Sequence, residues 1–340
     1  MTLNFISLLL HSFIHFVREM WRQIEEKERV KKNVMKKTYH LCLSAGEEVM
    51  FRDNEDYHRG FNCFALALYK TGSSGLVESF MSTHTHQLVQ STDPDAFIQS
   101  FRLSYSMYFN QKYRRRGKLG EPRHFALEIA GHHHLIAAAS YILRNALHHG
   151  IVPIPYAYPH CSVNAIFRTE MGKFLTERLL KPASYQRHIG RRADFPESYK
   201  MSESGVFLRE TVLDIPQIEN IFGTPRAFNY YMSRKSSEEW EAEQNRDNNG
   251  ISPINLEAIE YGVRSHSLDK MLIYESGKAD YTKVSDITLC SELDRLARNR
   301  YGRHSVYQLT LKEKQEIASE LYRTRHISEP QIRRCLAFPK

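Results

Sequence analysis

Hydrophobic and polar positions repeat with clear periods from residue 38 onward. The segment TYHLCLSA (38–45) predicts a strand, and Asp53 or Asn54 can cap a helix that continues to about residue 70. After the turn TGSSG (71–75), the segments LVESFM (76–81) and HTHQLVQ (84–90) predict two short strands. The tight connection between them, at Ser82 and Thr83, indicates a hairpin.

The same kind of pattern continues through residues 91–150. STDPDAF (91–97) opens a second helix that runs to about Lys112, and HFALEIA (124–130) predicts another strand. HHHLIAAASYILRNALHH (132–149) predicts a helix that Gly150 closes. The order β-α-β-β-α-β-α predicts an α+β fold with a ferredoxin-like, or RRM-like, antiparallel sheet, helices on one face and one extra helix. The apolar stripe of the second helix includes Tyr105 and Tyr108, which we expect to pack in the core rather than to stack on bases.

Residues beyond 150 carry a weaker pattern. VPIPYAYPHCS (152–162) predicts an irregular exit from the first domain, and residues 164–282 predict a helical or irregular extension with a solvated linker near 233–252. Helical segments at roughly 285–299, 310–324 and 328–338 predict a small helical domain over residues 283–340. Its last two helices have the spacing of a helix-turn-helix, in which Gln331, Arg333 and Arg334 would contact DNA. The alternative is a small helical bundle that caps the preceding domain.

The first 37 residues have two interpretations. Their apolar positions fit a helical stripe, but the run is short, is interrupted by polar residues and lacks a basic start. We therefore predict neither a signal peptide nor a membrane span. Either the segment is a helical extension, or translation begins at Met20 or Met35.

Composition adds a preference for an anionic partner. The 340 residues include 47 Lys and Arg against 39 Asp and Glu, a net charge of +8, which favours nucleic acid as a partner. The five cysteines are scattered without a CxxC pair, which argues against a disulfide framework or a cysteine-rich zinc site and fits the cytoplasm. A basic loop over residues 112–118 would attract a DNA backbone through Lys112, Arg114, Arg115, Arg116 and Lys118.

Two histidines one residue apart are the first candidates for chemistry. Residues i and i+2 of a strand face the same way, so His84 and His86 point toward one place. Tyr141 and Asn145 are four residues apart and lie on one face of the predicted helix. A divalent cation held by two imidazoles and an amide oxygen would polarise a phosphodiester while Tyr141 attacks it and becomes a phosphotyrosine. Mn²⁺ suits such mixed ligands better than Mg²⁺.

The other histidines of the same helix have simpler interpretations. We expect His132, His133 and His134 to be exposed residues of the first turn. His148 and His149, at the other end, we interpret as structural, since a partly charged imidazole is favoured at a helix C-terminus.

Several segments together resemble one known family. TYHLCLSAG, FRDNEDYHRGF, FMSTHTHQLVQS, FIQSFRLSYSMYFNQKY and SYILRNALHHGIVP are similar in order and spacing to the single-tyrosine HUH transposases, in particular the REP-associated tyrosine transposases. That family has a histidine–hydrophobe–histidine strand, then a helix with tyrosine and, four residues later, asparagine or glutamine. The similar region covers residues 38–163, and Thr85 departs from the pattern because it replaces the hydrophobe.

The resemblance implies a function and its residues. It implies an HUH endonuclease domain with His84, His86 and Asn145 as ligands of Mg²⁺ or Mn²⁺, and Tyr141 as the nucleophile. The family cuts single-stranded DNA, often near hairpins, and commonly works as a dimer. We therefore expect a cytoplasmic, nucleoid-associated homodimer that nicks and joins single-stranded DNA, with no membrane partner. The alternatives are a catalytically silent, domesticated transposase that binds hairpin DNA and a metal-dependent phosphodiesterase that uses water.

Overall fold

The computed structural model describes residues 35–46, 48–174, 177–190, 193–234, 237–247, 250, 284–325 and 327–338. The chain divides after Lys37, and apart from the first residue of β1 the elements described lie in Thr38–Lys340. The helical stripe expected over residues 1–37 lies almost wholly outside the described residues, as does the part of the extension beyond residue 250. Among the described helices, none has the length and apolar character that a membrane crossing requires.

The sheet contains β1 (Lys37–Ser44), β2 (Ser74–Phe80), β3 (His84–Ser91) and β4 (Phe125–Ile129) in the order β2-β3-β1-β4. β1 and β4 are antiparallel, and so are β2 and β3, in which Phe80 lies opposite Thr85 and Ser79 opposite His86. This confirms an α+β fold with a four-stranded antiparallel sheet and places β1 and β3, which are far apart in sequence, side by side at its centre.

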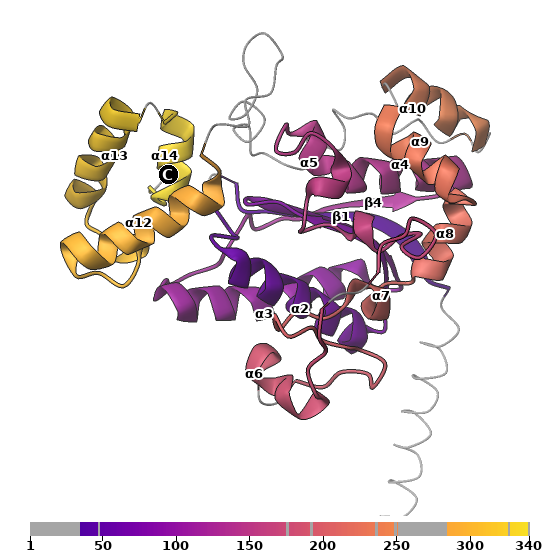
Figure 1. Cartoon of the computed structure of the whole chain (residues 1–340), viewed down its shortest axis with the longest axis horizontal. Coiled ribbons are helices and arrows are strands. Elements are labelled where there is room, and N and C mark those ends of the chain that lie inside the picture. Colours follow the sequence, from indigo (N-terminus) through magenta and orange to yellow (C-terminus); the bar gives the residue numbers. More distant parts are fainter. Residues whose placement is uncertain are drawn as a thin grey trace, which may run out of the picture. The chain divides into compact units, whose positions relative to one another are not determined.

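Helices α2 (Asn54–Thr71) and α3 (Pro94–Tyr113) cover one face of the sheet (Figure 1). Each begins at a capping aspartate: the Asp53 carboxylate accepts from the Asp56 N–H, and the Asp93 carboxylate from the Ala96 N–H. Aromatic rings fill the layer between them and the sheet, including Phe51, Phe61, Phe64, Phe80, Phe97 and Phe101.

The two tyrosines of α3 belong to this layer. Tyr105 is buried, and its hydroxyl donates to the Met50 carbonyl at 2.6 Å, which confirms the prediction of core packing. Tyr108 is half-buried and donates to Asp56, so its hydroxyl is used inside the fold as well.

Helix α4 (His132–Leu143) and the short α5 (Asn145–His148) lie on the opposite face (Figure 1). The single helix predicted for residues 132–149 is therefore interrupted at Arg144, whose N–H donates to the carbonyls of Ser140 and Tyr141. Residues of α4 pack against β2, β3 and β4 and cover this face of the sheet.

The extension contains short helices. They are α6 (Gln186–Ile189), α7 (Arg209–Val212), α8 (Ile215–Phe222), α9 (Pro225–Arg234) and α10 (Ser237–Gln244), with 3₁₀ turns at η1 (Pro155–Ala157), η2 (Ser162–Asn164), η3 (Pro182–Ser184) and η4 (Asn245–Asp247). The prediction of a solvated linker near 233–252 is wrong where α9, α10 and η4 lie.

This segment is structured because two of its acidic side chains bind the start of α4. The Asp247 carboxylate accepts hydrogen bonds from the N–H groups of His133 and His134 and pairs with the His134 ring at 2.6 Å. Glu243 pairs with the His133 ring at 2.6 Å. The prediction that this histidine run is exposed is thus wrong for His134, which is 1% exposed, whereas His132 is exposed.

The C-terminal part is helical, as predicted: α12 (Asp286–Tyr301), the turn η5 (Val306–Gln308), α13 (Leu311–Arg325) and α14 (Glu329–Cys335). They share a core that contains Leu289, Leu293, Ile317, Leu321 and Ile332, and Val49 of the sheet domain joins it. The domain boundaries expected after residues 163 and 282 stay predictions.

Two of the three residues expected to read DNA are buried inside these helices. Arg334 forms a two-pronged ion pair with Asp286, and the Gln331 amide donates to Asp286 and to the Val284 carbonyl at 2.8 Å. The expectation that Gln331 and Arg334 contact DNA is therefore wrong, because both side chains are bound to Asp286 of α12. Arg333 alone of the three is exposed, so α14 has the character of a bundle helix.

A buried arginine links the C-terminal helices to the sheet domain. Arg52 is 1% exposed; it pairs with Asp294 of α12 at 3.0 Å and donates to the Cys335 carbonyl at 2.9 Å. Its guanidinium also lies over the rings of Tyr113 and Tyr307, at 5.5 and 5.4 Å from their centroids.

Arg52→Met should destabilise the protein by about 3–5 kcal/mol, because it leaves the Asp294 charge buried without its cation. The double variant Arg52→Met/Asp294→Asn should recover part of the loss, since the amide is neutral and still accepts from the Val306 N–H. Urea unfolding measures both. Arg300→Met, which breaks an exposed pair with Glu320, is the matched control and should change little. Equal effects of Arg52→Met and Arg300→Met would contradict the role of Arg52.

Candidate active site between strand β3 and helix α4

His84 and His86 face the α4 side of the sheet. Phe80 packs among the rings of the α2–α3 layer, and its register partner Thr85 faces the same way. Because side chains alternate along a strand, His84 and His86 point to the opposite face. Both are fully buried. Thr85 thus lies outside the site, on the far face of the sheet, where its hydroxyl accepts from the Gln87 amide.

A third histidine, His40 of β1, joins this pair. Its Nε2 lies 3.0 Å from the Nδ1 of His86, in a hydrogen bond between the two central strands. The Nδ1 of His84 lies 3.1 Å from the Thr83 hydroxyl. In each histidine of the pair the Nδ1 atom therefore has a hydrogen-bond partner, and Nε2 is the atom that would bind a ligand.

Tyr141 of α4 lies above the same histidines. Its ring centroid is 5.3 Å from that of His86, with the rings nearly perpendicular at 88°, and 6.0 Å from that of His40. Tyr141 is 2% exposed, and Asn145, at the start of α5, is fully buried. The structure thus brings Tyr141 together with the two histidines predicted to accompany it.

Two further histidines extend the cluster from the end of α5. The His149 ring lies 5.4 Å from that of His84, and the His148 ring lies 6.2 Å from that of Tyr141. His149 is buried while His148 is exposed. Sequence reasoning missed His149 and His40. The residue spacing alone held no signal for them, because their proximity depends on the strand order and on the interruption at Arg144.

Burial keeps the central imidazoles neutral. It lowers the pKa of His40 to about 3. Burial, followed by the neighbouring His84 and His40, holds the pKa of His86 well below its usual value, and burial with His84 lowers the pKa of His149 likewise. Neutral imidazole is the form that binds metal ions, so these rings are ready to act as ligands at any pH near neutral.

The donor atoms present fit a small set of mixed ligands. Among the described residues, the Nε2 of His86 and both amide atoms of Asn145 are buried without a hydrogen-bond partner. The described part of the chain holds no group of three His, Cys, Asp or Glu side chains that could bind a metal ion, so a metal held by His84 and His86 would need another donor, such as the Asn145 amide. Three such donors would leave coordination positions for substrate oxygens, as in catalytic metal sites.

The basic loop divides into residues that hold it and residues that face solvent. Lys112 pairs with Asp53, Glu55 and Asp56, so its charge is compensated. Arg115 pairs with Glu48 at 2.8 Å and donates to loop carbonyls. The exposed cations of the loop are Arg114, Arg116 and Lys118.

No protein-family model matches the chain, and no curated protein matches it. Among solved structures, a REP-associated tyrosine transposase bound to a REP hairpin is similar over 42% of this chain and 84% of its own length, at 11% identity and a TM-score of 0.36.

His40→Gln should weaken Mn²⁺ binding by about 10–100-fold, because it removes the imidazole that orients the His86 ring. Electron paramagnetic resonance of free Mn²⁺ in a titration measures the affinity. His132→Gln is the control, since His132 is exposed at the start of α4. Unchanged affinity in His40→Gln, with loss in His86→Gln, would show that the hydrogen bond does not orient the ligand.

Proposed function

We propose that the chain is a metal-dependent endonuclease and strand transferase of single-stranded DNA, with Tyr141 as the nucleophile. The observation that carries the proposal is the convergence of His84, His86 and Tyr141 on one face of the sheet, with 5.3 Å between the rings of His86 and Tyr141. A phenol beside two buried imidazoles is an arrangement suited to covalent attack on phosphorus. Transposition, hairpin DNA as substrate and a homodimer belong to the same proposal and follow from the family resemblance.

The chain's own residues would hold the cation. His84 and His86 would contribute their Nε2 atoms and Asn145 its amide oxygen, and Mn²⁺ suits this set better than Mg²⁺. When bound, the ion supplies Lewis acidity to the scissile phosphate and offsets the charge that develops on its oxygens. The His40 ring holds the His86 ring in place through its hydrogen bond.

Tyr141 would form and later break one phosphoester bond. The phenol gives its proton to water and its oxygen attacks phosphorus. The bond from phosphorus to the 3′-oxygen breaks, and that oxygen takes a proton from water and leaves as a 3′-hydroxyl. The phosphotyrosine retains the bond energy, so a second 3′-hydroxyl attacks it, joins the strands and releases the phenol. No hydrolysis is needed in either half of the reaction.

The burial of the site favours a second candidate function. Tyr141 is 2% exposed and both strand histidines are fully buried, so a phosphodiester cannot reach them in the conformation described. A catalytically silent protein that binds hairpin DNA or regulates its host would need no such access. The endonuclease requires that the cover of Tyr141 opens when DNA binds.

A labelled single strand carrying a hairpin, incubated with the full chain and Mn²⁺, tests the proposal. We expect an adduct that survives denaturation with the wild type, and none with Tyr141→Phe, which lacks the attacking oxygen. Tyr69→Phe removes an exposed hydroxyl on α2 and should form the adduct normally. Chelation of the metal should abolish the adduct as well.

The other outcomes separate the alternatives. An adduct that persists in Tyr141→Phe would place the nucleophile elsewhere, and cleavage without any adduct would support a hydrolase that activates water. Hairpin binding with neither cleavage nor adduct would support the catalytically silent protein.

A further inference from the structure

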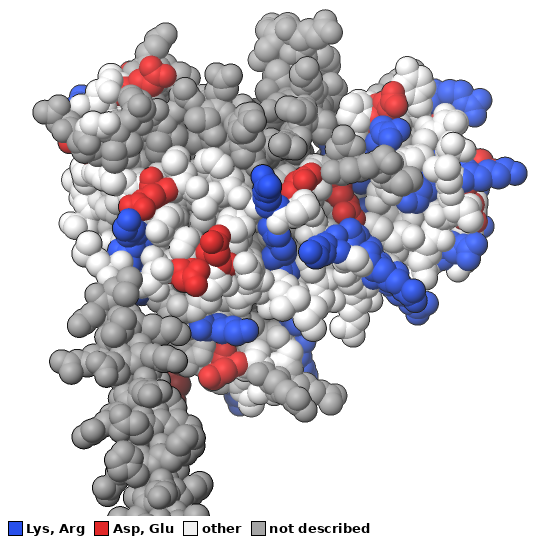
Figure 2. Space-filling view, turned by 180° about the vertical axis from the view of Figure 1, so that it is seen from behind, with Lys and Arg blue, Asp and Glu red and all other residues white. Residues whose placement is uncertain are grey.

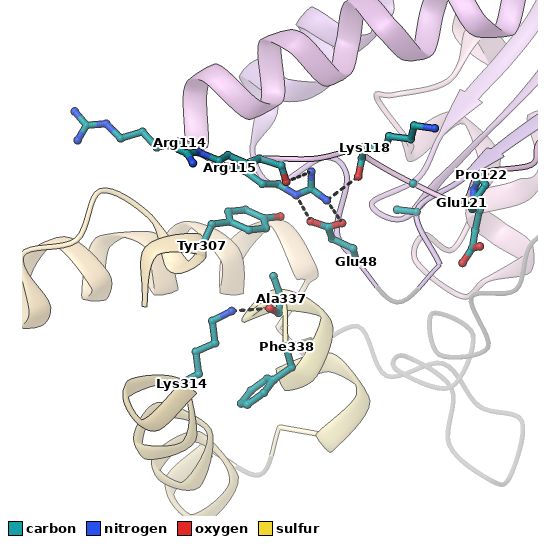
Figure 3. Close-up of a pocket in the computed structure, with 13 residues that line it drawn as sticks. Glu48, Arg114, Arg115, Lys118, Glu121, Pro122, Tyr307, Lys314, Ala337 and Phe338 are labelled. Atoms are coloured by element: carbon teal, nitrogen blue, oxygen red, sulfur yellow. Dashed lines mark hydrogen bonds and ion pairs between the residues drawn. The ribbon is translucent and has the colours of Figure 1, made fainter. Parts of the chain in front are cut away.

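A cleft of about 670 Å³ lies where the basic loop meets the C-terminal helices (Figure 3). This volume is within the roughly 300–1,000 Å³ of ligand sites in proteins. The loop of the sheet domain contributes Arg114, Arg116 and Lys118 to one wall, and the C-terminal helices contribute Lys314 and Phe338 to the other.

One wall is a fixed loop that carries three available cations. Arg115 holds the loop, because its guanidinium pairs with Glu48 and donates to the carbonyls of Gly117 and Lys118 (Figure 3). Arg114, Arg116 and Lys118 line the cleft, and in the described part of the chain they make no ion pair. The loop that carries these three positive charges is therefore held in place, and the charges themselves are exposed, which is what an anionic ligand requires.

The opposite wall offers a cation and an aromatic ring. The Lys314 ammonium of α13 donates to the Ala337 carbonyl at 2.6 Å, and burial lowers the pKa of Lys314 to about 8. The half-buried ring of Phe338 has the Arg333 guanidinium 5.5 Å and the Lys314 ammonium 5.9 Å from its centroid. A ring beside a row of cations is the combination by which proteins bind unpaired nucleotides.

The cleft lies at the same end of the sheet as the candidate active site. Ala45 lines the cleft, and its N–H donates to the Thr83 carbonyl at 2.7 Å, one residue before His84. On the face drawn in Figure 2, Lys and Arg side chains gather toward the side of the C-terminal helices, with Asp and Glu side chains interspersed. A strand bound in the cleft would thus lie on a basic surface beside His84.

We propose that this cleft binds a short segment of single-stranded DNA next to the phosphate that Tyr141 attacks. Phosphates would contact Arg114, Arg116 and Lys118, and a base would stack on Phe338. A duplex is disfavoured because the cleft is a concave pocket, whereas duplex grooves are read by protruding elements. This inference rests on the proposed function for the identity of the nucleic acid, but binding in the cleft does not depend on cleavage.

Binding of fluorescent oligo-dT of eight nucleotides to the full chain in EDTA tests the cleft without cleavage. The variant Arg114→Gln/Arg116→Gln/Lys118→Gln should bind about tenfold or more weakly and reduce the slope of log affinity against log salt by about 2, since each phosphate contact contributes about 0.7 for a single strand. The control Arg295→Gln/Lys312→Gln/Arg323→Gln removes three exposed charges of the C-terminal helices outside the cleft and should keep the slope.

The stacking partner is tested separately. Phe338→Leu keeps an apolar side chain against the helical core but loses the ring, and should weaken binding about tenfold, whereas Phe338→Tyr should not. Thermal melting confirms that these variants are folded.

Equal losses in the two triple variants, an equal loss for a duplex of the same length, or tighter binding of oligo-U RNA would each overturn the inference. A protein that forms no adduct but binds oligo-dT through the cleft rejects the proposed function and keeps this inference. If the variant Arg114→Gln/Arg116→Gln/Lys118→Gln forms the adduct normally and binds oligo-dT as tightly as the wild type, this inference is rejected and the proposed function is kept.

Discussion

The hydrogen bond between His40 and His86 is the contact around which the site is organised. Both faces of the central strands are covered, one by α2 and α3 and the other by α4, so water is not available to imidazoles placed there. A buried polar ring must find a partner inside the protein or pay for its desolvation. The two central strands meet this requirement with each other's side chains, at 3.0 Å, and the result is a His86 ring with one defined orientation below Tyr141.

Much of the sheet domain was predictable from the sequence because its signals are local. Asp53 and Asp93 cap the two long helices, and alternation along β3 places His84 and His86 on one face. The residues that were missed or misjudged depend on contacts distant in sequence. His40 reaches the site only because β1 lies next to β3, and Arg334 is buried only because Asp286, 48 residues earlier in the chain, pairs with it.

A few buried polar contacts join the C-terminal helices to the sheet domain. Arg52 connects α12 and the end of α14 to the segment between β1 and α2, and the Ser82 hydroxyl beside β3 donates to Asp286 at 2.8 Å. Asp286 therefore binds both a side chain of the C-terminal helices, Arg334, and the loop that precedes His84. Because these contacts are buried and directional, they fix the wall that Lys314 and Phe338 present to the basic loop.

The carboxylate of Asp247 makes the first turn of α4 electrostatically different from the other end of the helix. At its first turn, the N–H groups that would otherwise attract a phosphate already bind this carboxylate, and Glu243 adds a second negative charge. At the other end of the segment, His148 of α5 is exposed. The two ends of the segment formed by α4 and α5 therefore differ in local electrostatics: carboxylates bind the N–H groups of the first turn, and the imidazole of His148 faces solvent at the last.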